Sequence, residues 1–300
     1  MTASGGRENH WLRHGWGVRV STREELLNMV TSIALLESKR SYAWRGQSNA
    51  DWGISSSLSR SLNATNDPTE DRIRAREVEV LAESRKWGIS RELGNSATDL
   101  HMLSTLQHHG VPTRLIDVTA NPMTAIWFAT QPNVDKYGRE TSGVLFAFDV
   151  TSMPWHHTFQ HGQPPTMGDL SYPLSWSLIS ALEESESNRN SFRLYSALPD
   201  ERMKAQEGYF LASSTPTKPS IPGVEGLYLK GSPPGAADLE LMKFTFGRGR
   251  GRPTKLPFCA IVISARVKKQ MREPLKNTYN RRPRVLFPDI DGFREALPDL

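Results

Sequence analysis

The order of its segments predicts that this chain folds as a single α+β domain, with a mixed β-sheet and inserted helices. Segments with helical periodicity and short apolar segments typical of strands follow one another irregularly, without an internal repeat or an obvious linker. Of the 300 residues, 37% are hydrophobic, and Trp, Phe and Tyr are well represented. A chain of this length and composition can bury a substantial core, so a folded domain is expected rather than disorder.

Residues 1–40 are predicted to form an N-terminal helical extension, and residues 41–300 the main domain. Within the extension, Ser21 or Thr22 can cap a helix, and Glu24 or Glu25 follows in the first turn. Apolar residues then recur at helical spacing at Leu26, Leu27, Val30, Ile33 and Leu36.

Short apolar or aromatic segments predict the strands of the main domain. They are residues 42–46, 111–118, 143–150, 209–213, 239–246, 258–263 and 286–292, the last followed by a turn. Residues 143–150 are nearly all apolar, which is typical of a central strand. Pro112 stands near the start of its segment, where proline is tolerated.

Helices are expected between these strands. They comprise a long helical region opening at residues 67–68, a helix over 99–108 ending before Gly110, a helix beginning at 121–122 and a basic helix over 265–275. Residues 54–62 are rich in serine and are predicted to be extended or looped. Residues 151–200 are predicted to be loop-rich, and residues 247–253 to form an exposed loop.

The net charge of +5 is unevenly distributed. Residues 241–300 contain 14 lysines and arginines against 5 acidic residues, so the first 240 residues are net acidic. This basic C-terminal part indicates either a surface that faces a polyanion or a solvated face that keeps the protein in solution. Arg248, Arg250 and Arg252, on a glycine-rich backbone, suit single-stranded RNA or DNA. Lys268 and Lys269 extend the same predicted nucleic-acid-binding surface, although an accidental basic loop explains the arginines equally well.

Several patterns point to the cytoplasm and to no membrane partner. No run of about 18 apolar residues occurs, and the first 20 residues lack the apolar stretch of a secretion signal. The single cysteine, Cys259, excludes an internal disulfide and a thiolate metal cluster. It lies in an apolar strand-like segment, so we expect it to be a small core residue.

Arg45 ends an aromatic segment and is followed by Gly46. A guanidinium group offers a planar, permanently charged fork that suits a phosphate or pyrophosphate. Glycine at the next position allows a ligand to approach the backbone closely. The alternative is that Arg45 pairs with a carboxylate at the edge of the core, such as Asp117.

Residues 108–119 are unusually rich in polar groups for a strand. Period-2 alternation places Asp117 and Thr119 on one face, where they could bind a hydroxyl-rich ligand such as ribose. Arg114 falls on the opposite face and is expected to pair with a buried acid. His109 could bind a ligand, act as a general base or cap a helix. Adjacent histidines point in different directions, so no metal site is expected here.

The chain resembles the FRG domain family, which is named for an aromatic-Arg-Gly signature. The resemblance rests on four segments: Trp44-Arg45-Gly46-Gln47, the long run from Gln107 to Pro122 with Ala125 and Phe128-Ala129, Gln206-Glu207-Gly208-Tyr209-Phe210, and Leu286-Phe287-Pro288-Asp289-Ile290-Asp291-Gly292.

The order of these segments is also similar to the first half of the ADP-ribosyltransferase fold, a split, mixed β-sheet. This resemblance implies that NAD is the cofactor, held by Arg45 with Gly46, His109, Asp117 and Asn121. It implies that Thr119 supports the site and that Gln206 or Glu207 assists the transfer, with Glu240 in reserve. The chain departs from that superfamily: Asp117-Val118-Thr119 replaces a Ser-Thr-Ser signature, and no Glu-x-Glu or Gln-x-Glu motif occurs.

Three functions follow as hypotheses. The first is an NAD-dependent ADP-ribosyltransferase-like enzyme that modifies RNA or DNA, as a toxin or antiphage effector with a neutralising antitoxin as partner. The second is a non-enzymatic nucleic-acid or nucleotide-binding module. The third is a metal-dependent nuclease that uses Asp117, His109 and the pair Asp289 and Asp291. A turn that closes the domain is the alternative explanation for the two acids of that pair.

Overall fold

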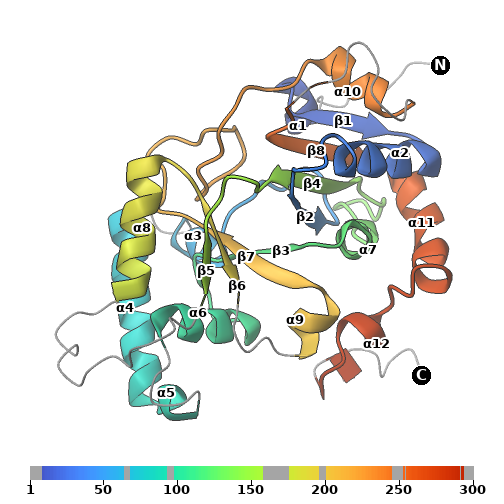
Figure 1. Ribbon diagram of the computed structural model, residues 1–300. Coiled ribbons are helices and arrows are strands. Elements are labelled where there is room, and N and C mark those ends of the chain that lie inside the picture. The colour runs from blue at the N-terminus through green and yellow to red at the C-terminus, as the bar shows by residue number, and fades with distance from the viewer. Residues whose placement is uncertain are drawn as a thin grey trace.

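A mixed eight-stranded sheet forms the centre of the computed structural model, which describes residues 9–63, 68–92, 98–157, 176–195, 201–244, 253, 255–290 and 292–293. The strand order is β1-β8-β4-β2-β3-β7-β6-β5 (Figure 1). The strands are β1 (Gly17–Val20), β2 (Tyr42–Gln47), β3 (Ile116–Thr119), β4 (Gly143–Asp149), β5 (Trp155–His157), β6 (Phe192–Tyr195), β7 (Gly208–Ala212) and β8 (Phe258–Ile263). The predicted α+β class with a mixed sheet is confirmed.

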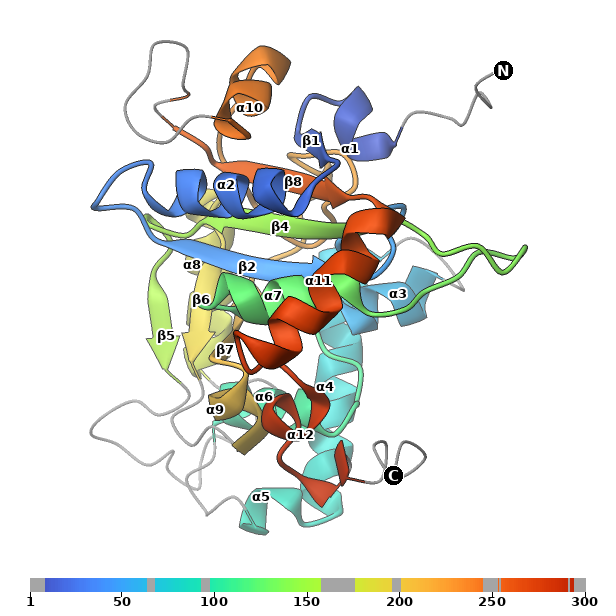
Figure 2. The same ribbon diagram turned by 90° about the vertical axis from the view of Figure 1, so that its right-hand side faces the viewer.

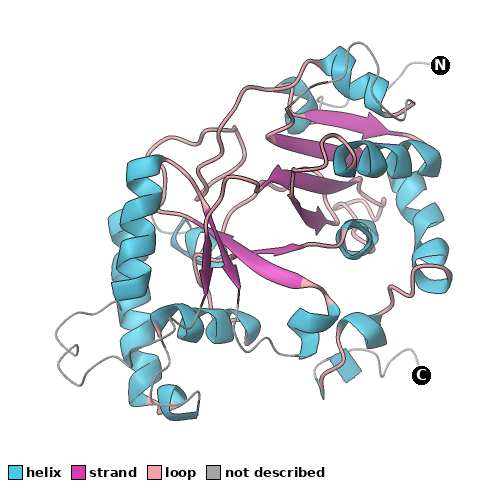
Figure 3. Cartoon of the chain, in the orientation of Figure 1, coloured by secondary structure: helices cyan, strands magenta, loops and turns pink. Residues whose placement is uncertain are grey.

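Helices surround this sheet (Figure 3). They are α1 (His10–Arg13), α2 (Arg23–Ala34), α3 (Ser57–Asn63), α4 (Glu70–Lys86), α5 (Ile89–Glu92), α6 (Asp99–His108), α7 (Pro122–Thr130), α8 (Trp176–Asn188), α9 (Glu201–Ala205), α10 (Ala236–Met242), α11 (Ala265–Asn277) and α12 (Pro283–Leu286). The predicted caps are present, because Thr22 accepts a hydrogen bond from the amide of Glu25 and Pro122 stands in the first turn of α7.

The sheet divides into two halves between β2 and β3. Among the described residues of these two strands, Trp44 and Thr119 form the one pair in register, whereas β2 pairs with β4 over six residues. One half therefore contains β1, β8, β4 and β2, and the other contains β3, β7, β6 and β5. Figure 1 shows the two groups of strands running in different directions where they separate.

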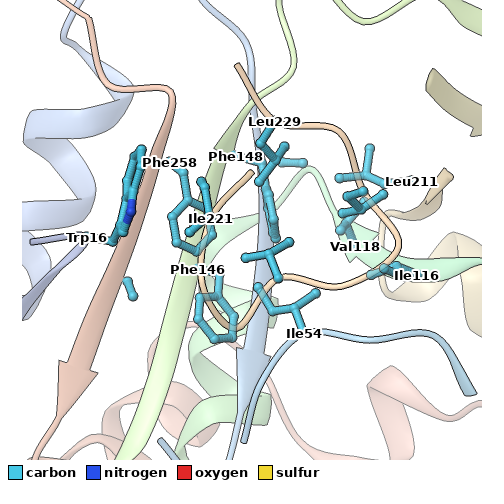
Figure 4. Packing of buried hydrophobic residues seen from close by; sticks show 14 of the residues in the cluster. Trp16, Ile54, Ile116, Val118, Phe146, Phe148, Leu211, Ile221, Leu229 and Phe258 are labelled. Atoms are coloured by element: carbon cyan, nitrogen blue, oxygen red, sulfur yellow. The ribbon is translucent and has the colours of Figure 1, made fainter. Parts of the chain in front are cut away.

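Three apolar clusters hold these layers together. One lies on a sheet face and spans both halves, with Phe258 next to Trp16, Phe146 and Phe148 beside Phe258, and Val118 and Leu211 beyond them (Figure 4). A second cluster joins the sheet to α2, α7 and α11, which lie on one side of the strands in Figure 2. The third packs α6 and α8 against β6 and β7. Burial of these side chains is the main source of stability.

Two glycines allow α7 to lie directly on the strands. A Cβ atom on Gly46 would be 1.8 Å from the carbonyl oxygen of Ala125, and one on Gly143 would be 2.1 Å from the carbonyl oxygen of Ala129. The small side chains of Ala125 and Ala129 complete this contact. Helix packing thus requires a glycine at position 46, which is a reason for Gly46 in addition to the ligand approach expected from the sequence.

Several predicted elements were wrong. Residues 239–246 were expected to be a strand, but the described part of this segment belongs to α10 and the turn after it, with Leu239 and Met242 buried three residues apart on one helical face. The described residues of the segment 286–292 contain the end of α12 instead of a strand, because Pro283 begins a helical turn there.

Other segments differ in extent. The serine-rich segment 54–62 contains most of α3, whose first turn is capped by the Ser56 hydroxyl, which accepts from the amide of Ser59. The strand expected over 111–118 is limited to Ile116–Thr119, and the segment expected to be loop-rich contains β5, α8 and β6. The first 40 residues contribute β1, which pairs in parallel with β8.

Cys259 is fully buried in β8, as predicted, and burial raises its pKa to about 12. Within the described ranges, no helix combines the length and the apolar character needed to cross a membrane.

Candidate active site

A cleft of about 410 Å³ opens where the two halves of the sheet separate. Its walls come from β2, β3, β7, α6, α7 and α9, and Figure 2 shows α7 above α9 and α6. The lining residues include Arg45, Gln107, His108, Asp117, Thr119, Phe128, Arg202 and Gln206. Residues far apart in the sequence, including the predicted Arg45, Thr119 and Gln206, therefore meet in one place.

Arg45 projects from β2 with its charge only partly compensated. Its Nη1 donates to the backbone oxygen of Asp117 at 2.6 Å and lies 3.8 Å from the Asp117 carboxylate. Its Nε is buried and has no hydrogen-bond partner among the described residues. Burial lowers the pKa of Arg45 and the Asp117 carboxylate opposes this, but an arginine stays protonated. This geometry therefore favours the binding of an anionic ligand by the Arg45 guanidinium group.

Asp117 is held in place by Gln107, at the end of α6. The Gln107 amide nitrogen donates to Oδ2 of Asp117 at 2.9 Å, and its amide oxygen accepts from the Thr113 hydroxyl at 2.8 Å. The Asp117 side chain is 61% exposed, so it remains accessible. Sequence reasoning missed the role of Gln107, and the available signal was its place at the start of the same long motif as Asp117.

Thr119 is buried, and its hydroxyl is engaged within the protein. It donates to the backbone oxygen of Gln206 at 2.7 Å and accepts from the amide of Asn121 at 3.0 Å. Because the hydroxyl proton is committed, Thr119 fixes the position of Gln206. Asp117 and Thr119, which the alternation placed on one face, both line the cleft, but Asp117 is exposed and Thr119 is buried.

The adjacent residues Gln206 and Glu207 have different surroundings. Gln206 lines the cleft, and its amide nitrogen donates to the backbone oxygen of Leu286 at 2.9 Å. Glu207 has a φ of 51° and accepts from Asn121 at 2.7 Å and from Arg281 at 3.0 Å. It is not among the residues that line the cleft. The reserve candidate Glu240 lies on α10, where it pairs with Lys243.

Two other predicted ligand-binding residues have local structural roles. His109 is the exposed C-cap of α6, which was one of its three expected roles, whereas the neighbouring His108 lines the cleft. Asn121 caps α7 by accepting from the amide of Met123 at 2.9 Å. Neither His109 nor Asn121 belongs to the lining of the cleft.

Arg114 is structural, as predicted. It is 3% exposed, and its guanidinium group binds Glu77 at 2.5–2.9 Å and Glu70 at 3.1–3.2 Å. It also donates to the backbone oxygen of Ser213 at 3.1 Å. Burial acts against its charge, but the two carboxylates raise the pKa of Arg114 above its ordinary value. This network ties α4 to the strands that form one side of the cleft.

The predicted basic surface is only partly present in the described residues. Lys268 is fully buried and donates to the backbone oxygens of Ser48 at 2.7 Å and Thr141 at 3.1 Å, so it cannot contact a nucleic acid. Lys269 is 65% exposed, 3.6 Å from Glu140. Residues 248, 250 and 252, which carry the predicted arginines, lie outside the described residues.

The described residues of the proposed nuclease site are not gathered. Asp117 lines the cleft but His109 does not. Asp289 forms a turn, as the alternative explanation predicted, because its Oδ1 accepts from the amide of Gly292 at 2.7 Å, and Asp291 lies outside the described part. In the ranges that the structure describes, no group of three or more His, Cys, Asp or Glu could hold a metal ion.

Comparison with known proteins identifies one family. The FRG domain matches residues 40–137, which contain Arg45, Gln107, Asp117 and Thr119. No curated protein and no solved structure matches the chain. Residues 40–137 are therefore similar to the FRG domain, and this matched region supplies the β2, α6, β3 and α7 walls of the cleft.

Proposed function

We propose that this protein is an NAD-dependent ADP-ribosyltransferase-like enzyme that modifies RNA or DNA. The observation that carries the proposal is the convergence of Arg45, Thr119 and Gln206 on one cleft at the division of the sheet. In a cell such an enzyme would act as a toxin or antiphage effector in the cytoplasm, and a neutralising protein would be its partner.

The residues present fit NAD. The cleft volume of about 410 Å³ is within the range of small-molecule sites. The buried Nε of Arg45 has no hydrogen-bond partner among the described residues. A pyrophosphate oxygen of NAD would accept a hydrogen bond from this Nε and carries the negative charge that favours it. The accessible carboxylate of Asp117, oriented by Gln107, suits a ribose hydroxyl.

NAD would supply an ADP-ribosyl group: the bond between nicotinamide and ribose breaks, nicotinamide leaves, and the acceptor atom bonds to the ribose carbon as it loses its proton to solvent. Positive charge would develop on the ribose of a bound NAD during this change. The Gln206 amide oxygen has no partner among the described residues and can stabilise that charge electrostatically. The Thr119 hydroxyl holds Gln206 by donating to the Gln206 backbone oxygen, and Arg45 binds the pyrophosphate of NAD.

The test is transfer of label from NAD, labelled in its adenylate phosphate, to RNA and to single-stranded DNA. We expect labelled nucleic acid with the wild-type protein and loss of at least about 99% of the rate with Arg45→Ala. Arg76→Ala is the control, because it removes the same charge from an exposed position on α4 and should keep the rate.

The outcomes separate the hypotheses. Absence of transfer with nucleic-acid affinity intact would favour the non-enzymatic binding module. Strand cleavage that depends on a divalent metal would favour the nuclease. Equal transfer by the wild type and Arg45→Ala would remove Arg45 from the site.

A further inference from the structure

A second arginine lines the cleft and is not used by the proposed transfer chemistry. Arg202, on α9, lies with its guanidinium carbon 4.3 Å from the ring centroid of Phe287. Among the residues that the structure describes, no carboxylate pairs with Arg202, whereas Glu201 in the same turn pairs with Lys204. Its positive charge is therefore available to a ligand.

Stacking orients Arg202 without consuming its hydrogen-bonding capacity. A guanidinium group on an aromatic ring uses its flat face, while its N–H donors lie in the plane and point outward. Phe287 is itself held by ring contacts to Trp127 and Phe128, at 5.8 and 6.1 Å. The hydrogen bond from Gln206 to the backbone of Leu286 fixes the chain next to Phe287. Arg202 is thus a preorganised anion-binding group beside Gln206.

We propose that Arg202 contacts a backbone phosphate of the acceptor nucleic acid and so contributes to acceptor recognition. This proposal rests on the proposed function in taking a nucleic acid as acceptor. Arg45 accounts for the anionic part of NAD, so Arg202 is left for a phosphate of the other substrate. Helix α12, which packs against α9, contains Arg284, and Arg282 is its N-cap residue. Arginines on two adjoining helices suit the successive phosphates of a nucleic-acid strand better than the two phosphates of a dinucleotide.

The test measures binding of short fluorescent single-stranded RNA and DNA by anisotropy at several NaCl concentrations, without NAD. We expect Arg202→Ala to weaken binding roughly tenfold at low salt and to reduce the slope of log affinity against log salt by about 0.7, the value for one phosphate contact on a single strand. Arg202→Lys keeps the charge but loses the planar stack, so its affinity should be intermediate. Phe287→Leu removes the aromatic ring on which Arg202 stacks, so this variant should also bind the oligonucleotides with intermediate affinity.

Two controls make the result specific. Arg76→Ala removes one exposed positive charge outside the cleft and should leave the affinity within about twofold of the wild type and the slope unchanged. NAD binding, measured by calorimetry, should be the same for Arg202→Ala and the wild type. A loss of NAD affinity with unchanged oligonucleotide affinity would overturn the assignment and give Arg202 to the dinucleotide phosphates.

Equal effects of Arg202→Ala and Arg76→Ala on oligonucleotide binding would also overturn the proposal, and so would a wild-type protein that binds none of the oligonucleotides. Failure of the proposed function is distinguishable, because it appears as intact, Arg202-dependent binding without transfer of label from NAD.

Discussion

Arg45 and Arg114 both lie in the matched FRG region, but their surroundings assign them opposite roles. Arg114 is enclosed by two carboxylates and a backbone oxygen, so all its charge is used inside the protein. Arg45 has a backbone oxygen, a carboxylate at 3.8 Å and a buried nitrogen without a described partner. Period-2 alternation could separate the two arginines, because it placed Arg114 on an apolar face.

Replacing Arg114 tests the structural role. Arg114→Met would leave Glu77 buried without a cation, and removal of one partner of a buried ion pair costs about 3–5 kcal/mol. Urea denaturation of this variant should show a loss of that size in the free energy of unfolding. Arg139→Met, at a position where the side chain is 74% exposed, should change it by less than about 1 kcal/mol. Similar losses in both variants would refute the role given to Arg114.

Gln206 and Glu207 form a matched pair for the third position of the site. We expect Gln206→Ala to lower the rate of transfer from NAD about 100-fold, because in the proposed reaction the amide oxygen would stabilise the charge that develops on the ribose. Glu207→Gln retains an oxygen that can accept from Asn121 and should stay within about threefold of the wild type. The rates of label transfer at saturating NAD decide between them, and the reverse order would assign the role to Glu207.

At the scale of elements, the sequence predicts long or strongly apolar segments best. The strands over 42–47, 143–149, 208–212 and 258–263 were predicted within a few residues, because each is a short apolar run bounded by turns. The short helices α10 and α12 were not predicted, because they span seven and four residues, which are too few to establish a helical period. Their assignment depends on packing against α2 and α9, which no local pattern contains.

The glycines under α7 test the helix packing. Gly46→Ala and Gly143→Ala would each place a methyl group within about 2 Å of a backbone oxygen of α7, and such overpacking costs about 1–3 kcal/mol or more. Thermal unfolding should show clearly lower midpoints for both variants. The control is Gly110→Ala, which keeps a positive φ of 78° but meets no atom within 4 Å, and should cost only the roughly 1 kcal/mol of the backbone conformation. Equal losses at the three positions would contradict the packing explanation.

At the scale of the whole molecule, Lys268 joins parts that are distant in the sequence. From α11 it donates to Ser48, after β2, and to Thr141, before β4. Its burial could not be predicted, because the sequence shows only a lysine in a basic helix and not the two backbone oxygens that meet it. The division of the sheet is equally non-local, since it depends on how β2 and β3 diverge after Trp44 and Thr119.

The pH dependence of stability tests this buried lysine. Burial lowers the pKa of Lys268 to about 8, although the Glu140 carboxylate opposes the shift. Between pH 8 and about 10.4, the value in an unfolded chain, the unfolded state binds more protons than the folded state, so stability from this group rises with pH. The free energy of unfolding of the wild type minus that of Lys268→Met should therefore be larger at about pH 10 than at about pH 7.5. A constant or falling difference would contradict the lowered pKa.

Calorimetric titration with NAD tests the central claim most directly, because the claim is that residues from both halves of the sheet form one NAD-binding cleft. We predict measurable binding to the wild type and to Arg139→Met, whose side chain is exposed, and an affinity at least about tenfold lower for Arg45→Met, since a charge-assisted hydrogen bond is lost. Absence of NAD binding to the wild type, or equal affinity in Arg45→Met, would contradict the account.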